Sequence, residues 1–268
     1  MKLIVAARTD QGLVRPNNED NFYISEEKGL LVVADGMGGH ASGEIASKMA
    51  IDIIRDYFDN IIGEKEKLIG KYNEEFSETT NRVGSAVRLA NMAIHEASQS
   101  NPEWQGMGTT LDAVSLNDKR LSIVHVGDSR VYLVRAGYIE QLTDDHTLVH
   151  EQVRRELLTK EEAEVSDMRH ILTRALGIRE EIDVDLDELT LADGDILILC
   201  SDGLSTMVPD DDILSVVTSV NDPAAACERL IDVANDNGGK DNITVIVAYT
   251  RKSNWFSCLL KLLQWFRG

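Results

Sequence analysis

Hydrophobic and polar positions repeat with two different periods along the chain, and the period divides the chain into elements. Dense aliphatic runs predict strands, whereas apolar residues three or four apart predict helices. The expected strands cover residues 3–10, 29–35, 109–116, 120–129, 130–137, 183–191, 195–200 and 242–250. The expected helices cover residues 43–58, 74–99, 209–219 and 222–236, and glycine at position 84 weakens the second of them.

The connections between the central strands indicate the type of sheet. Only a few residues separate the three strands between positions 109 and 137, and connections that short force antiparallel pairing. Residues 144–180 are charged and helical in pattern, with a turn signal at 158–163, and we expect an insertion over one end of the sheet. The sequence therefore predicts one domain in which helices cover an antiparallel sheet system.

Composition narrows the class of protein. The chain has 268 residues, 43% of them hydrophobic, which is ample for a packed core. Its formal net charge of −19 would repel a nucleic acid and suits divalent cations. Cys200, Cys227 and Cys258 form no CxxC pair, so we expect reduced thiols in a cytoplasmic protein. No apolar run is long enough to span a bilayer.

The glycine-rich segment LLVVADGMGGHASGE, residues 30–44, allows two interpretations. GMGGHA (36–41) matches the G-x-G-x-x-A spacing of a dinucleotide-binding loop, which would make the protein a nicotinamide-dependent oxidoreductase. Against that, the charge of Asp35 would face a pyrophosphate, and the sheet pattern is antiparallel. The same strand–Asp–Gly pattern recurs at LILCSDGL (197–204), which favours the aspartate, rather than the glycines, as the functional element.

Five aspartates share a position in the pattern. Four of them directly adjoin an apolar strand run, where an unpaired carboxylate is costly unless a cation neutralises it. The set consists of Asp20, Asp35, Asp128, Asp202 and Asp241. These are too many acids for one octahedral ion, so the sequence predicts a site for at least two divalent cations.

Seven ordered motifs carry a resemblance to a known family. They are RPNNED (15–20), VVADGMGGHASGE (32–44), GMGTTL (106–111), VGDSRVYLVR (126–135), LTDDHT (142–147), LCSDGL (199–204) and GGKDN (238–242). Over residues 1–250 the chain resembles the bacterial PPM, or protein phosphatase 2C-like, serine/threonine phosphatases. The resemblance implies a four-layer α-β-β-α sandwich, two antiparallel sheets flanked by helices, and it identifies residues 144–180 as the family's flap.

The resemblance also implies a binuclear Mn²⁺ or Mg²⁺ centre between the sheets. Asp35 is expected to bridge the two ions, and the carbonyl of Gly36 to bind one of them. Asp202 and Asp241 are expected to bind the other ion. Asp128 matches an acid that helps to bind a third, weaker ion in some relatives, and Asp202 is a candidate to share that ion.

The remaining catalytic roles follow from the same resemblance. Asp20 resembles the acid that holds metal-bound water, and Arg15 resembles the arginine that binds the substrate phosphate. Animal relatives carry a histidine directly after the metal-binding Asp-Gly, where this chain has Met37. His40 lies three positions further on, as in bacterial members. Three alternatives for the general acid stay open: His40, a metal-bound water, or no group at all.

These residues predict phosphoester hydrolysis without a covalent nucleophile. Two cations about 4 Å apart can activate water and neutralise the phosphate. We expect a cytoplasmic protein phosphatase for phosphoserine and phosphothreonine, whose partners are a serine/threonine kinase and its phosphorylated substrates, selected by the flap. The non-enzyme alternative is a catalytically silent regulatory binding module on the same fold.

The C-terminal segment, residues 251–268, lies beyond the resemblance. It holds four basic residues and no acidic one. Between positions 255 and 266 the three polar residues share one helical face, which leaves two interpretations. The segment is either a helix docked on the domain or on a second subunit, or an interfacial helix that anchors the protein to an anionic membrane surface.

Overall fold

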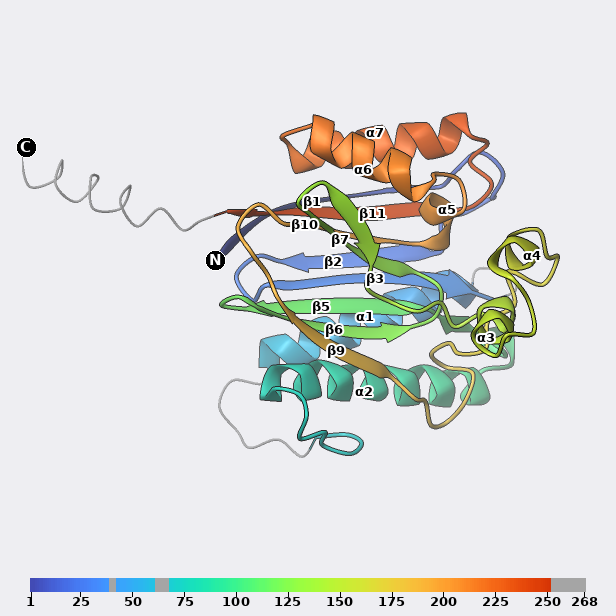
Figure 1. The fold of residues 1–268 in the computed structure, drawn as a ribbon. Coiled ribbons are helices and arrows are strands. Elements are labelled where there is room, and N and C mark those ends of the chain that lie inside the picture. Colours follow the sequence, from blue (N-terminus) through green and yellow to red (C-terminus); the bar gives the residue numbers. More distant parts are fainter. Residues whose placement is uncertain (39–41, 61–67, 252–268) are drawn as a thin grey trace, which may run out of the picture.

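The computed structural model describes residues 1–38, 42–60 and 68–251, arranged as four layers (Figure 1). The strands are β1 (Lys2–Asp10), β2 (Asp20–Ser25), β3 (Leu30–Met37), β4 (Gly108–Thr109), β5 (Leu111–Asn117), β6 (Arg120–Val126), β7 (Arg130–Arg135), β8 (Tyr138–Gln141), β9 (Asp185–Thr190), β10 (Ile196–Cys200) and β11 (Ile243–Arg251). The α-helices are α1 (Ser42–Asn60), α2 (Glu78–Ser100), α3 (Leu148–Arg154), α4 (Lys160–Glu164), α5 (Asp202–Ser205), α6 (Asp210–Ser219) and α7 (Pro223–Asp236).

Two sheets form the inner layers. One has the strand order β1-β11-β10-β7-β8, and the other has the order β2-β3-β5-β6-β9 with the short β4 paired to β3. Every strand pair is antiparallel, as the short central connections predicted. The described residues therefore lack the parallel βαβ unit that a dinucleotide-binding loop requires. The predicted α-β-β-α sandwich of two antiparallel sheets is confirmed.

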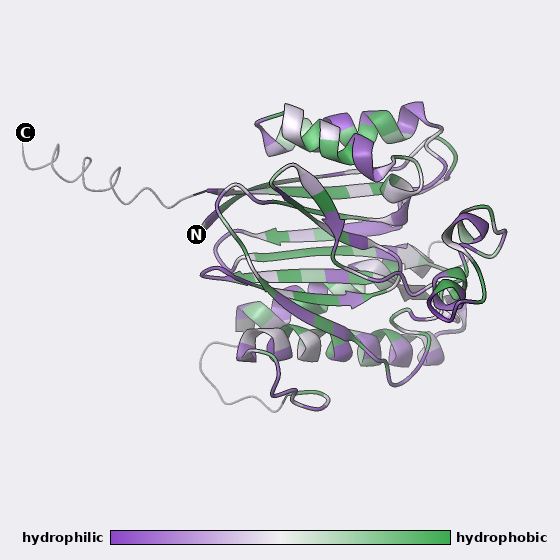
Figure 2. Cartoon of the chain, in the orientation of Figure 1, coloured by the Kyte–Doolittle hydropathy of each residue, from purple (hydrophilic) through white to green (hydrophobic). Residues whose placement is uncertain are grey.

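The inner strands are apolar on both faces because each sheet is covered twice. In β3, Leu30 and Val32 pack against α1 and α2, whereas Leu31 and Val33 pack against the facing sheet. Helices α6 and α7 bury the outer face of the sheet that contains β11. Figure 2 shows the same pattern as hydrophobic colour along the strands and hydrophilic colour on the outer helix surfaces. Continuous apolar runs, rather than alternating ones, are the result.

Helix α2 starts later than the predicted residue 74. The Ser77 side chain accepts a hydrogen bond from the Thr80 amide, which caps the helix at Glu78. Gly84, predicted to weaken this helix, lies inside it. A Cβ at this position would lie 3.0 Å from a methyl carbon of Leu186, so glycine allows the incoming end of β9 to approach the helix closely.

Some elements differ from the sequence prediction. Strands β2 and β8 were not expected. Both lie at the edge of a sheet; β2 shows almost no alternation in burial, and β8 has only four residues. The turn predicted at 158–163 is wrong in part, because helix α4 begins inside this range. There Thr159 and Glu162 form a capping box that opens α4. Among the described residues no helix is long and apolar enough to cross a membrane.

Candidate metal centre

Two of the predicted acids face each other in one sheet. Asp20 opens β2, and the strand register places it directly opposite Asp35 near the end of β3. The amide of Gly36 donates a 3.2 Å hydrogen bond to the carbonyl of Glu19, which continues this pairing. A Cβ at Gly36 would lie 2.1 Å from the carbonyl oxygen of Gly43, so no larger residue fits beside the start of α1. The hairpin thus holds both carboxylates at one end of the sheet.

Two further acids adjoin each other in the second sheet, where β10 and β11 are neighbours. Asp202 follows β10 at the start of α5, and Asp241 lies just before β11. The amide of Ser201 donates to the carbonyl of Thr244 at 3.0 Å, which ties the two strand ends together. A Cβ on Gly203 would lie 2.0 Å from the carbonyl oxygen of Asn242. Glycine is therefore needed where the two loops touch.

A buried hydrogen bond joins the two pairs of acids. Ser201 Oγ, at the end of β10, donates to Asp20 Oδ2 across the sheets at 2.7 Å. The side chain of Asn242 also bridges the sheets, because its Oδ1 accepts from the Glu19 amide at 2.8 Å. Strand ends from both sheets consequently meet at one end of the sandwich. Figure 1 shows α3 and α4 of the predicted flap at this same end.

The pKa values of the acids reflect their closeness to one another. Burial raises the pKa of Asp35 well above its ordinary value, and the charges of Asp20, Asp202, Asp128 and Asp241 raise it further. Burial likewise raises the pKa of Asp202, followed by the charges of Asp128, Asp241 and Asp20. Burial raises the pKa of Asp128 to about 6. Carboxylates from the two sheets therefore repel one another, a condition that a bound cation would relieve.

Asp20 is the most enclosed of these acids. Its residue is 5% exposed, and burial raises its pKa to about 6, against the hydrogen bond from Ser201, which lowers it. Its Oδ1 atom is buried and has no hydrogen-bond partner within the described part of the chain. An unpartnered carboxylate oxygen among other carboxylates fits a divalent cation or a water that such a cation holds.

Arg15 forms an ion pair with one of these acids. Its Nη2 lies 2.5 Å from Asp241 Oδ2, and the side chain is 53% exposed. The hydrogen bond to Asp241 raises the pKa of Arg15, and the charges of Asp202 and Asp35 contribute to the same shift. His170 of the predicted flap also feels the charges of Asp241 and Arg15, although burial is the main cause that lowers its pKa. Within the flap, the His146 amide donates to the carbonyl of Gly127 beside Asp128, so the flap borders the acids.

The acids do not yet surround a single point as the ligands of a bound ion would. Over residues 1–38, 42–60 and 68–251, no three His, Cys, Asp or Glu side chains are grouped as they would be around a single ion. Existing partners account for part of this, since Asp241 is turned to Arg15 and Asp20 Oδ2 to Ser201. Binding of cations would require Asp241 to release Arg15.

The general acid predicted at His40 lies outside the described residues, as does Cys258. Met37, which takes the place of the animal histidine, ends β3. Cys200 and Cys227 are free and buried, in agreement with the expectation of reduced thiols.

Three supporting residues were present in the sequence motifs but received no predicted role. Ser201 links the sheets, Asn242 secures the loop before Asp20, and Thr110 accepts from the Asp35 amide through Oγ1 at 3.1 Å. Each lies inside LCSDGL, GGKDN or GMGTTL. Their place inside the quoted motifs was the available signal, but side-chain partners more than 70 residues away are not visible from spacing.

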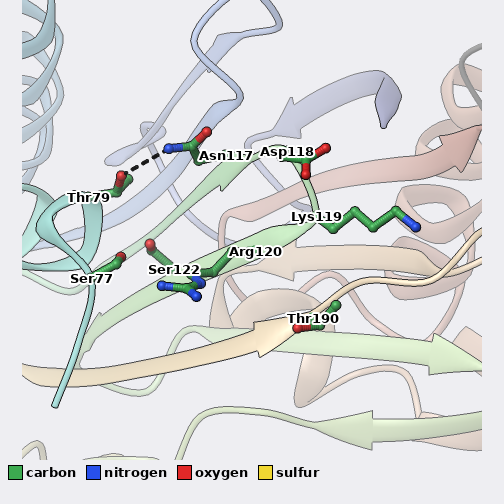
Figure 3. A pocket seen from close by; sticks show the side chains of 8 residues that line it. All are labelled: Ser77, Thr79, Asn117, Asp118, Lys119, Arg120, Ser122 and Thr190. Carbon is green, nitrogen blue, oxygen red and sulfur yellow. Dashed lines mark hydrogen bonds between the residues drawn. The ribbon is translucent and has the colours of Figure 1, made fainter.

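A separate polar pocket lies at the opposite end of the sheet that contains β5, β6 and β9. Figure 3 shows its lining, which includes the β5–β6 turn at Asn117 and Asp118 together with Lys119 and Arg120. Arg120 already lies 3.6 Å from Glu188 in an ion pair. The pocket has a volume of about 370 Å³ and adjoins none of the five acids. The acids and Arg15 therefore remain the candidate site.

Comparisons with known proteins agree with the fold and the motifs. The family described as Protein phosphatase 2C matches residues 14–241. The chain is 40% identical over 243 residues to the serine/threonine protein phosphatase PstP of Mycobacterium tuberculosis, covering 91% of this chain and 44% of that protein. It is 38% identical to the serine/threonine phosphatase stp of Listeria monocytogenes, covering 90% of this chain and 93% of that one. The chain thus spans less than half the length of PstP.

Solved structures give the same result. The catalytic domain of PstP in complex with two manganese ions superposes with a TM-score of 0.81 at 39% identity, covering 94% of this chain and 99% of that one. A Streptococcus agalactiae serine/threonine phosphatase superposes with a TM-score of 0.82 at 35% identity, covering 93% and 100%. The fold is therefore that of the bacterial serine/threonine phosphatases. The chain belongs to the protein phosphatase 2C family.

Proposed function

We propose that this chain is a metal-dependent protein serine/threonine phosphatase. The observation that carries the proposal is the meeting of Asp20 and Asp35 from one sheet with Asp202 and Asp241 from the other, in a region where burial and mutual repulsion raise the pKa of three of them. The manganese-containing structure of the similar PstP domain supports the same conclusion.

Each acid has a proposed role toward the ions. Asp35 would hold two ions, Mn²⁺ or Mg²⁺, and the carbonyl of Gly36 would bind one of them. Asp202 and Asp241 would bind the other, and Asp128 would contribute to a weaker third position. When bound, the ions supply an activated water and neutralise charge on the phosphate. These are hard oxygen ligands of the kind that both metals prefer.

Asp20 and Arg15 act on water and substrate. Asp20 orients the attacking water through its free Oδ1 and is held in place by Ser201 at Oδ2. Arg15 is paired with Asp241, so it must release that carboxylate when Asp241 turns toward an ion. The released guanidinium can then bind two phosphate oxygens as a fork. For the leaving alcohol, three proposals remain: a proton from His40, a proton from a metal-bound water, or no general acid.

Hydrolysis of p-nitrophenyl phosphate tests the proposal. We expect activity to vanish on chelation and to return with Mn²⁺ or Mg²⁺, and Asp202→Ala to resemble the chelated protein. Asp232→Asn is the matched control, because Asp232 is an exposed carboxylate on α7. Failure of restored metal to give hydrolysis would favour the silent binding module, an alternative that draws support from the incomplete grouping of the acids in the described residues.

The proposed substrates are phosphorylated proteins, which a serine/threonine kinase would supply. The relatives PstP and stp are named serine/threonine phosphatases, and the flap borders the acids here through His146. We propose that residues 144–180 select among phosphoproteins. Exchanging this segment for that of a relative should change the ranking of phosphothreonine peptides while p-nitrophenyl phosphate hydrolysis persists. An unchanged ranking would disprove the selection role.

We also propose a cytoplasmic location, with contact of residues 251–268 to an anionic membrane surface as one alternative. The structure describes only Arg251 of this segment. The support comes from its basic and apolar composition. Flotation with anionic vesicles should separate the full chain from a chain ending at residue 250. Equal flotation of both would leave docking on the domain or on a second subunit.

A further inference from the structure

The motif LTDDHT, residues 142–147, runs alongside the turn that carries Asp128. Thr143 Oγ1 accepts a hydrogen bond from the Val131 amide at 3.1 Å. On the other side of the turn, the Gly127 amide donates to His146 Nδ1 at 3.1 Å, and the His146 amide donates to the carbonyl of Gly127 at 2.7 Å. The motif therefore holds the turn at both of its ends.

A partly buried ion pair strengthens this attachment. The guanidinium of Arg130 binds the carboxylate of Asp145 with N···O distances of 3.0, 3.2 and 2.7 Å. A two-pronged contact of this kind fixes orientation as well as distance. Consequently the residues on each side of Asp128 are bound to the first residues of the flap.

The ring of His146 extends the attachment to the end of the flap. The residue is 5% exposed. Because Nδ1 accepts the Gly127 amide, Nε2 carries the proton and donates to Asp185 Oδ2 at 3.1 Å. Arg174 Nη1 donates to the other oxygen of this carboxylate, Asp185 Oδ1, at 2.6 Å. Thr173 next to it donates its amide to the carbonyl of His146 at 2.7 Å. His146 thus contacts the Asp128 turn and β9 through its ring, and the flap exit through its carbonyl.

The turn has little freedom to move elsewhere. Gly127 has a φ of +121°, and a Cβ there would lie 2.5 Å from Cβ of Thr110. Thr110 in turn binds the main chain of Asp35, with its amide 2.8 Å from the Asp35 carbonyl. The turn is thereby wedged between the segment that holds Asp35 on one side and His146 on the other. Loss of the hydrogen bond to His146 would therefore free the turn only on the side that faces the flap.

We propose that His146 is a positioning residue, whose imidazole sets the Gly127–Asp128 turn relative to Asp35 and couples that turn to the flap. The proposal rests on the proposed phosphatase function for its effect on catalysis. Its structural part, the hold on the Gly127 amide, stands independently of any activity. His146 itself touches no reacting group and acts through the turn.

Two substitutions separate the functions of the two ring nitrogens. His146→Asn places an amide oxygen near the position of Nδ1, so it can accept the Gly127 amide but does not reach Asp185. His146→Gln places its polar atoms near the position of Nε2, so it can reach Asp185 but leaves the Gly127 amide unpaired. Both replacements are neutral and similar in size, which makes each the control for the other.

The first measurement is hydrogen exchange at the Gly127 amide in the metal-free protein. We expect exchange about tenfold faster in His146→Gln than in wild type, because an unpaired buried amide loses a hydrogen bond. His146→Asn should stay close to wild type. Equal exchange in the two variants would overturn the proposal, including the case in which both rise together with a general loss of thermal stability.

The second measurement is Mn²⁺ binding by titration calorimetry, with Asp128→Asn as the reference variant. We expect His146→Gln to reproduce the weakening seen in Asp128→Asn, by about 10- to 100-fold for the weakest class of ion. Its kcat should fall while KM for p-nitrophenyl phosphate is retained. His146→Asn should keep both the Mn²⁺ affinity and the kcat of wild type. A wild-type isotherm and kcat in His146→Gln would refute the coupling. If the wild-type protein neither binds Mn²⁺ nor hydrolyses p-nitrophenyl phosphate, the proposed function fails. The exchange rate of the Gly127 amide then still decides whether His146 positions the turn.

Discussion

Replacement of Asp20 by asparagine should stabilise the metal-free protein. Burial raises the pKa of Asp20 from an ordinary 3.8 to about 6. A carboxyl group whose pKa is higher in the folded than in the unfolded state does not destabilise the fold below its unfolded pKa. The loss of stability grows as the pH rises above the unfolded pKa and is complete above the folded pKa. A pKa shift of about 2 units lowers the free energy of unfolding by about 3 kcal/mol at pH 7.5, and by about half of that at pH 5.

Asparagine preserves most of the surroundings of this side chain. It is similar in shape, and its oxygen can still accept from Ser201 Oγ, the partner of Asp20 Oδ2. Removal of the charge also relieves repulsion of Asp35, whose pKa is raised by Asp20. We therefore expect Asp20→Asn to gain about 3 kcal/mol in the free energy of unfolding at pH 7.5, or about 6–12 °C in Tm for a chain of this size.

Thermal unfolding in a chelator at pH 7.5 and pH 5 measures this effect, with Asp232→Asn as the exposed control. The gain should shrink toward pH 5. Saturating Mn²⁺ should stabilise wild type more than the variant, because the ion is attracted to the charge of Asp20 in the folded state, which the variant lacks. A variant no more stable than wild type at pH 7.5, or a gain that is the same at both pH values, would refute the electrostatic account.

Two other substitutions test the geometry of the site. Arg15→Ala should lower kcat/KM by about tenfold or more through a higher KM, since hydrogen bonds to charged groups contribute about 1.5–3 kcal/mol. Its stability should change by less than about 1 kcal/mol because the Arg15–Asp241 pair is exposed. An unchanged KM would exclude Arg15 from phosphate binding. Gly203→Ala should destabilise by about 1–3 kcal/mol in urea unfolding, because its Cβ would meet the carbonyl oxygen of Asn242 at 2.0 Å. Stability equal to wild type would show that these loops are not packed as described.

Local patterns were sufficient for most of the elements. The strands at 195–200 and 242–250 and the helices at 209–219 and 222–236 agree with the structure to within one or two residues at each end. These elements are buried or amphipathic over their whole length, so their period is clear. Strand β2 was missed because it lies at the edge of its sheet, where burial does not enforce a period.

The candidate site was predictable in its residues but not in its contacts. The sequence alone determined which carboxylates follow apolar strands and, through ordered motifs, the family. The tertiary structure decided that Ser201 reaches Asp20 over a separation of 181 residues and that His146 holds the turn before Asp128. Strand and helix formation depends on neighbours along the chain, whereas the meeting of strand ends depends on how two sheets pack. That packing is a property of the whole core, which no single segment encodes.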